Sequence, residues 1–163
     1  MVRYNLNDLT PEQKREHLQK PGPRKKKRKS LSRRAKKKMD DGRKDLEDAC
    51  MDLWRKIVSC GMTVCVWCLK PARVYQCHHI ITKGSSKALK YDTDNGIFLC
   101  QGCHYRAHNS GSMDFAKFYE ENYPGKYEKL LLRKKNKIDL SKSGLIALKN
   151  GLEHELNCLE ENN

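Results

Sequence analysis

The sequence is poor in the residues that build a large hydrophobic core. Aromatic residues make up only 7% of the 163 residues, hydrophobic residues 37%, and charged residues 33%. No apolar run approaches the roughly 20 residues that a membrane-spanning helix needs. These shortages argue against a membrane protein and predict a small fold stabilised by an additional element such as a bound metal.

Acidic residues are absent from the stretch between Arg24 and Lys38, within a chain of formal charge +14 and pI near 9.5. The positive side chains of such a run repel one another, so we expect the run to be disordered or transiently helical until an anion neutralises it. We predict DNA as the partner rather than an anionic membrane surface. A solubilising charge run or a nuclear localisation signal is the alternative. The candidate phosphate contacts are Arg24, Lys25, Lys26, Lys27, Arg28, Lys29, Arg33, Arg34, Lys36, Lys37 and Lys38.

Eight cysteines occur without a secretory signal pattern, which favours a reducing compartment in which thiolates hold metal. Four of them form two Cys-x-x-Cys pairs, Cys65 with Cys68 and Cys100 with Cys103. A two-residue gap lets both sulfurs of a pair reach one tetrahedral ion at about 2.3 Å. The pairs predict a structural zinc site, and buried or disulfide-bonded cysteine is the alternative.

Four histidines surround the second pair in a pattern typical of a catalytic metal site. His104 and His108 are four residues apart, so on a helix both imidazoles leave one face, and His78 could supply a third ligand. His79 would then point the opposite way on an extended segment and be free to act as a general base. Three protein ligands leave positions open for chemistry. Asn95 could orient an imidazole, pin its loop, or simply form a turn before Gly96.

These residues together resemble the HNH endonucleases of the ββα-metal class. The resemblance rests on His78 to Gly84, HHIITKG, and on Asn95 to His104, NGIFLCQGCH, between the two cysteine pairs. It implies a hairpin followed by a helix, with His79 as the base and Asn95 as the middle letter of the motif. It also implies that His78, His104 and His108 hold the catalytic ion, and that the products are 5′-phosphate and 3′-hydroxyl ends.

One departure from the family affects the choice of catalytic metal. Many family members have Asp where this chain has His78. An all-nitrogen ligand set tolerates Zn²⁺, Ni²⁺ or Co²⁺ besides the favoured Mg²⁺ or Mn²⁺.

The flanking segments complete an expected α+β fold. We expect a basic arm over 1–39, an amphipathic helix over 40–61, the HNH core with its zinc knuckle over 62–111, and a helical extension over 112–163. Short strands are expected at Thr63 to Cys65 and at Arg73 to His79, and a polar loop at 82–93. Further candidate DNA contacts are Lys83, Lys87 and Arg106.

The last helix carries leucines on one stripe, from Leu145 to Leu159, which either dock on the helix over 40–61 or pair with a second copy. The chain is therefore expected to be a monomer or a homodimer through this helix. The order of its parts also resembles, more weakly, the phage NinG-type recombination proteins, which would imply a role in recombination, branched-DNA processing or DNA packaging. The expected location is then the host cytoplasm, or a nucleus only in a eukaryotic host.

Two classes of function remain at this point. The first is a metal-dependent DNA endonuclease, which uses both metal sets, Asn95 and the basic run. The second is a non-catalytic, zinc-stabilised DNA-binding protein, which leaves the four histidines unexplained.

Overall fold

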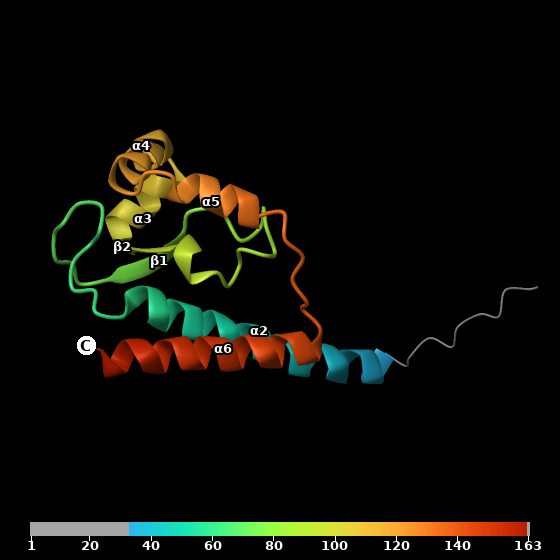
Figure 1. Cartoon of the computed structure of the whole chain (residues 1–163). Helices are drawn as coiled ribbons and strands as arrows, with labels where there is room; N and C mark the ends of the chain where they lie inside the picture. Colours follow the sequence, from blue (N-terminus) through green and yellow to red (C-terminus); the bar gives the residue numbers. More distant parts are fainter. Residues whose placement is uncertain (1–32, 163) are drawn as a thin grey trace, which may run out of the picture. The chain divides into compact units, whose positions relative to one another are not determined.

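A computed structural model describes residues 33–162, and their side chains from Gly42 onward. The chain divides into two compact units, and the account that follows concerns the second, Lys36–Asn163. The fold is of mixed helix and strand, as predicted. Its elements are α2 (Arg33–Ser59), β1 (Tyr75–His79), the 3-10 turn η2 (Thr93–Asn95), β2 (Gly96–Cys100), α3 (Gln101–His108), α4 (Ser112–Asn122), α5 (Lys126–Arg133) and α6 (Lys142–Glu161) (Figure 1).

Helix α2 is longer than the sequence indicated. It begins at Arg33 rather than Asp40, so the last part of the basic run is helical, whereas Arg24 to Lys29 lie outside the described residues. Alanine and lysine are strong helix formers, which explains why the helix extends through this segment. Gly61 follows with a φ of 68°, the left-handed conformation in which helices often end.

The two strands form one antiparallel hairpin, in which Tyr75 pairs with Cys100 and His79 with Gly96. The expected strand over Arg73 to His79 is confirmed in shorter form. The expected strand at Thr63 to Cys65 is wrong, because this segment leads into the tight turn of the first cysteine pair, and the partner of β1 is β2.

The hairpin is covered on both faces, which explains why its two adjacent histidines meet different neighbours. Successive side chains of a strand point to opposite faces. Gly96 faces α2, since a Cβ there would lie 2.2 Å from Cγ2 of Val58. Ile97 and Leu99 point the other way, into a cluster with Phe115 and Tyr119 of α4. The strands therefore form a thin middle layer between two helical layers.

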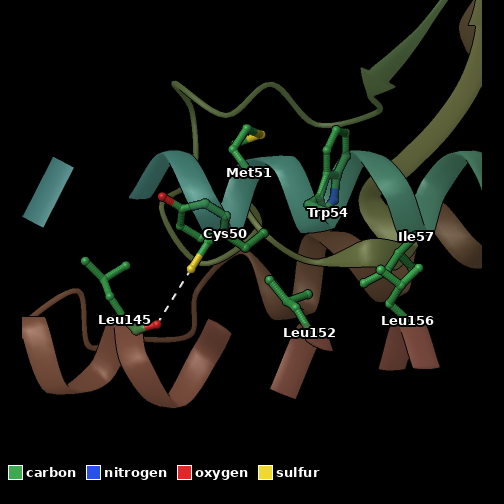
Figure 2. Packing of buried hydrophobic residues seen from close by; sticks show 8 residues of the cluster. Cys50, Met51, Trp54, Ile57, Leu145, Leu152 and Leu156 are labelled. Carbon is green, nitrogen blue, oxygen red and sulfur yellow. Dashed lines mark hydrogen bonds between the residues drawn. The ribbon is translucent and has the colours of Figure 1, made fainter. Parts of the chain in front are cut away.

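Helix α6 packs along α2, which confirms the docking alternative for its leucine stripe. Figure 2 shows Cys50 beside Leu145 and Ile57 beside Leu156, so the two helices run in the same direction. The Cys50 thiol donates a hydrogen bond to the carbonyl of Leu145 at 3.6 Å. The N-terminus of α6 is capped by Ser141, whose Oγ accepts a hydrogen bond from the N–H of Gly144.

The sequence analysis did not identify α5 as a separate helix within the expected extension over 112–163. In the structure Leu130 is 1% exposed and packs on Ile81 and Leu89. The loop before η2 is therefore not entirely polar, because Leu89 anchors it beneath α5.

No helix within residues 33–162 has the length and apolar character required to cross a bilayer.

Candidate metal centres

The four paired cysteines converge on one point. Cys65 and Cys68 lie in the turn after α2, and Cys100 and Cys103 lie where β2 passes into α3. All four sulfurs lie within 4.8 Å of one another, and those of Cys68 and Cys100 are 4.0 Å apart. Zinc–sulfur bonds of about 2.3 Å in a tetrahedron require sulfurs roughly 3.8 Å apart. The group therefore fits one zinc ion after small adjustments.

Hydrogen bonds from the backbone favour the thiolate form of one cysteine in this cluster. Burial works against ionisation of Cys65, but hydrogen bonds from the backbone of Cys68, Cys100 and Trp67 lower its pKa to about 7. Burial, together with hydrogen bonds to the neighbouring thiols, raises the pKa of Cys103. The Cys65 thiol therefore loses its proton more readily than an ordinary cysteine, and thiolate is the form that binds metal.

Three histidines form a second cluster. His78 comes from β1, and His104 and His108 come from one face of α3, with ring centroids 4.5 to 5.2 Å apart. Their ligand nitrogens all lie within 4.8 Å of one another. His78 is 5% exposed and its Nδ1 has no hydrogen-bond partner. A buried polar atom without a partner is costly, and a metal ion would satisfy it.

Burial favours the neutral, metal-ligating form of two of these imidazoles, His78 and His104. Burial lowers the pKa of His78 to about 3, and repulsion from His108, His104 and His79 acts in the same direction. Burial also lowers the pKa of His104, again helped by His108. A neutral imidazole has a free lone pair, so the donor set fits a divalent ion.

His79 lies on the opposite face of β1 and is held by two contacts. Its ring stacks on Trp54 of α2, with centroids 4.0 Å apart and planes at 10°. Its Nε2 lies 2.9 Å from the carbonyl oxygen of Lys90. Since a carbonyl only accepts, Nε2 carries the proton, and in the neutral ring Nδ1 is left with the lone pair. Burial lowers the pKa of His79, as do the positive charges of Lys83 and Arg55.

Asn95 acts on the loop rather than on an imidazole. It is fully buried, its Oδ1 accepts from the N–H of Ile81 at 2.8 Å, and its Nδ2 donates to the carbonyls of Ile81 and Leu89 at 2.8 and 2.9 Å. The described contacts of its side chain are to backbone alone. Because Leu89 precedes Lys90, Asn95 positions the carbonyl that holds His79.

The predicted DNA-contacting residues differ in their surroundings. Lys83 lines a cavity of about 310 Å³ together with His79, His104 and His108. Lys87 lies on the surface of the same loop. Arg106 stacks over the Trp67 ring at 4.7 Å and pairs with Asp114 at 3.7 Å. In the basic run, Arg33, Arg34, Lys36, Lys37 and Lys38 belong to α2, but their side chains lie outside the description.

Sequence reasoning missed two residues of this region, Trp54 and Arg55. Trp54 belongs to the buried cluster between α2 and α6, and its ring also supports His79. Arg55 was given no role, and it lines the same cavity as Lys83. No pattern in the sequence could have found them, because each contact joins α2 to a distant part of the chain.

The fold brings together a four-cysteine cluster that fits a structural zinc and, on a strand hairpin and a helix, a three-histidine cluster that could hold a second ion. The model of the HNH endonuclease family matches residues 65–110, a span that holds all seven candidate ligands, His79 and Asn95. Neither the curated proteins nor the solved structures contained a match to the chain. The NinG-type arrangement is not shown by these comparisons. The family match supports a nuclease or DNA-binding role with DNA as the partner.

Proposed function

We propose that the protein is a metal-dependent DNA endonuclease that hydrolyses a phosphodiester bond to 5′-phosphate and 3′-hydroxyl ends. The observation that carries the proposal is the convergence of three imidazoles, with His79 beside them on the opposite face of β1. A DNA-binding module without catalysis would not need a second metal set or a histidine with a fixed tautomer.

His78, His104 and His108 would hold the catalytic ion, Mg²⁺ or Mn²⁺ by preference and Zn²⁺ or Ni²⁺ as alternatives. When bound, such an ion supplies Lewis-acid stabilisation of the phosphate and the departing 3′ oxygen. The four cysteines would hold a separate, structural zinc, and their closed set leaves no position for substrate.

His79 acts as the general base through Nδ1. The Lys90 carbonyl keeps the proton on Nε2, and the stacked Trp54 ring limits rotation of the imidazole. Nδ1 can therefore accept a proton from the attacking water without a prior change of tautomer. Asn95 contributes indirectly by holding the loop that carries Lys90.

Arg55 and Lys83 bind the DNA backbone near the reaction. Both line the cavity that contains His79, His104 and His108. Their positive charges favour a phosphate there and stabilise the negative charge that builds up during hydrolysis. The basic run from Arg24 to Lys38 adds contacts that depend on salt rather than sequence.

Cleavage of supercoiled plasmid at low salt tests the proposal, with Mg²⁺, Mn²⁺, Zn²⁺, Ni²⁺ or EDTA. We expect metal-dependent nicking that falls by about 10²- to 10⁴-fold in His79→Ala, the usual contribution of a general base. The control is metal content, which should be unchanged in His79→Ala. Full activity in this variant with its metal retained would contradict the role of His79.

The competing function is a non-catalytic, zinc-stabilised DNA-binding protein. It predicts zinc bound by the cysteines, salt-sensitive DNA binding, and no cleavage with any of the four metals.

We propose phage recombination, branched-DNA processing or packaging as the biological setting. Comparison of junctions, flaps and linear duplexes as substrates tests this setting. A monomer should nick one strand, and a homodimer should give paired cuts.

A further inference from the structure

A second cavity opens on the other side of the metal-binding histidines. It has a volume of about 460 Å³ and shares His79, Thr82 and His108 with the cavity that contains Arg55 and Lys83. The two cavities therefore meet at the catalytic histidines. This volume lies within the range of about 300–1,000 Å³ typical of sites for small organic groups.

The walls of the second cavity differ in chemistry from those of the first. They include Phe115 and Tyr119, which are 6% and 5% exposed, and Tyr127, which is 41% exposed. Among the residues whose side chains the structure describes, no lysine or arginine lines this cavity, whereas Arg55 and Lys83 line the other. The second cavity is thus suited to a flat, apolar group, and the first to a phosphate.

The charged side chain at the second cavity is Glu120. One carboxylate oxygen accepts a long hydrogen bond from the N–H of Gly125 at 3.5 Å. A carboxylate repels phosphate and accepts hydrogen bonds from amino groups. Among nucleobases it therefore favours cytosine, adenine and guanine, which carry an exocyclic amino group, over thymine.

We infer that the second cavity binds one unpaired, amino-bearing nucleobase next to the scissile phosphate. The inference rests on the proposed function and adds the class of substrate, which is DNA with an unpaired nucleotide at the site of cleavage. A base inside a duplex cannot enter such a cavity, and an already unpaired base enters without the energetic cost of breaking a pair. Stacking on the exposed ring of Tyr127 stabilises it there.

The cavity depends on helices outside the matched span. Phe115, Tyr119 and Glu120 belong to α4 and Tyr127 to α5, whereas the family match ends at residue 110. The proposed base site therefore lies partly outside the span that matches the family.

The test measures binding separately from cleavage. The full chain carries His104→Ala, which removes a metal ligand but does not alter the lining of the second cavity. Fluorescence anisotropy gives Kd for a duplex with one unpaired cytosine and for the same duplex with an abasic residue at that position. We expect the cytosine duplex to bind about tenfold more tightly, within the range of base–aromatic stacking.

Three further variants in the His104→Ala background make the test specific. Tyr127→Ala should reduce the ratio of the two Kd values to nearly one, and Leu132→Ala, a change on the exposed side of the same helix, should leave it at about tenfold. Glu120→Gln should reduce the preference for unpaired cytosine over unpaired thymine, which we expect to be about fivefold. Equal Kd values for the two duplexes in the protein that carries His104→Ala alone would overturn the inference. A tenfold ratio of Kd values that survives Tyr127→Ala would also overturn it.

Wild-type cleavage distinguishes the two proposals. Plasmid cleavage combined with equal Kd values for the two duplexes would support the nuclease function and reject the base site. A tenfold ratio that depends on Tyr127, without cleavage under any metal, would support the base site and reject the nuclease.

Discussion

At the scale of single residues, backbone contacts position the proposed base, His79, and favour the thiolate of Cys65 in the cysteine cluster. The Lys90 carbonyl fixes the proton on His79, and backbone hydrogen bonds lower the pKa of Cys65 to about 7. Neither contact involves a side chain other than the one that is positioned. Substitutions that alter the backbone should therefore affect the site as strongly as substitutions of its neighbours.

Leu69 is the one described residue other than glycine with a positive φ, 56°. It lies directly after the first cysteine pair, is 74% exposed, and its N–H donates to the carbonyl of Cys65 at 2.8 Å. Its left-handed conformation costs about 1 kcal/mol that glycine does not incur.

We therefore expect Leu69→Gly to raise the free energy of unfolding by about 0.5–1 kcal/mol, measured by urea unfolding at constant zinc. The matched control is Leu132→Gly, which changes an equally exposed leucine in a helix and should lower the value by about 0.5–1 kcal/mol. A loss of stability in both variants would contradict the strain at Leu69.

Asn95 offers a second prediction at this scale. Asn95→Ala leaves the N–H of Ile81 and the carbonyl of Leu89 buried without their partner, which should cost about 3 kcal/mol. Plasmid cleavage should fall as well, because the loop that carries the Lys90 carbonyl is released. Asn109→Ala, which removes one exposed hydrogen bond to Tyr105, should cost less than about 0.5 kcal/mol. An equal cost in both variants would argue against a structural role for Asn95.

At the scale of elements, α2 and the hairpin approach each other closely where β2 begins. A Cβ on Gly96 would lie 2.2 Å from Cγ2 of Val58 and 2.9 Å from Cζ2 of Trp54. This contact brings Trp54 up to His79, so the spacing of two elements sets the position of the proposed base.

Gly96→Ala should lower the free energy of unfolding by about 1–3 kcal/mol through overpacking. Because Val58 makes the shortest contact, Val58→Ala combined with Gly96→Ala should cost less than the sum of the two single changes. The control is Gly151→Ala within α6, where a Cβ meets nothing within 4 Å and where we expect a gain of about 0.5–1 kcal/mol. Additive costs at Gly96 and Val58 would contradict the close approach.

What the sequence could predict follows from the range of the interactions. Local geometry at the start of α3 brings Cys100 close to Cys103, and helical periodicity brings His104 close to His108. Each of these two pairs was therefore predictable from the sequence. The alternation of a strand likewise predicted that His78 and His79 would diverge. The Lys90 carbonyl and the Trp54 ring were not predictable, because their contacts depend on how separate elements pack and a carbonyl has no signature in sequence.

At the scale of the whole molecule, the buried side chains form separate clusters. One joins α2 to α6 around Trp54 and Leu145, and another joins the zinc knuckle to α3 and α4 around Cys65 and Leu99. Only the second contains zinc ligands. The stability of the two clusters should therefore respond differently to metal.

Removal of zinc by a chelator, or the change Cys100→Ser, should unfold the knuckle region before the pair α2 and α6. Small folds with few apolar residues depend on their structural metal. Hydrogen exchange should show loss of protection over 65–119, with protection retained at Leu53 and Leu152 in the helix pair. Uniform loss of protection in both regions would contradict separate clusters.

The indole beneath His79 also sets where the active unit begins. Trp54 lies before residue 65, outside the matched span. A chimera that exchanged only residues 65–110 with another HNH protein would transfer every ligand and lose the support of the base. Transfer of the proposed activity to another protein should therefore require α2 as well, together with the α6 that packs on it (Figure 1).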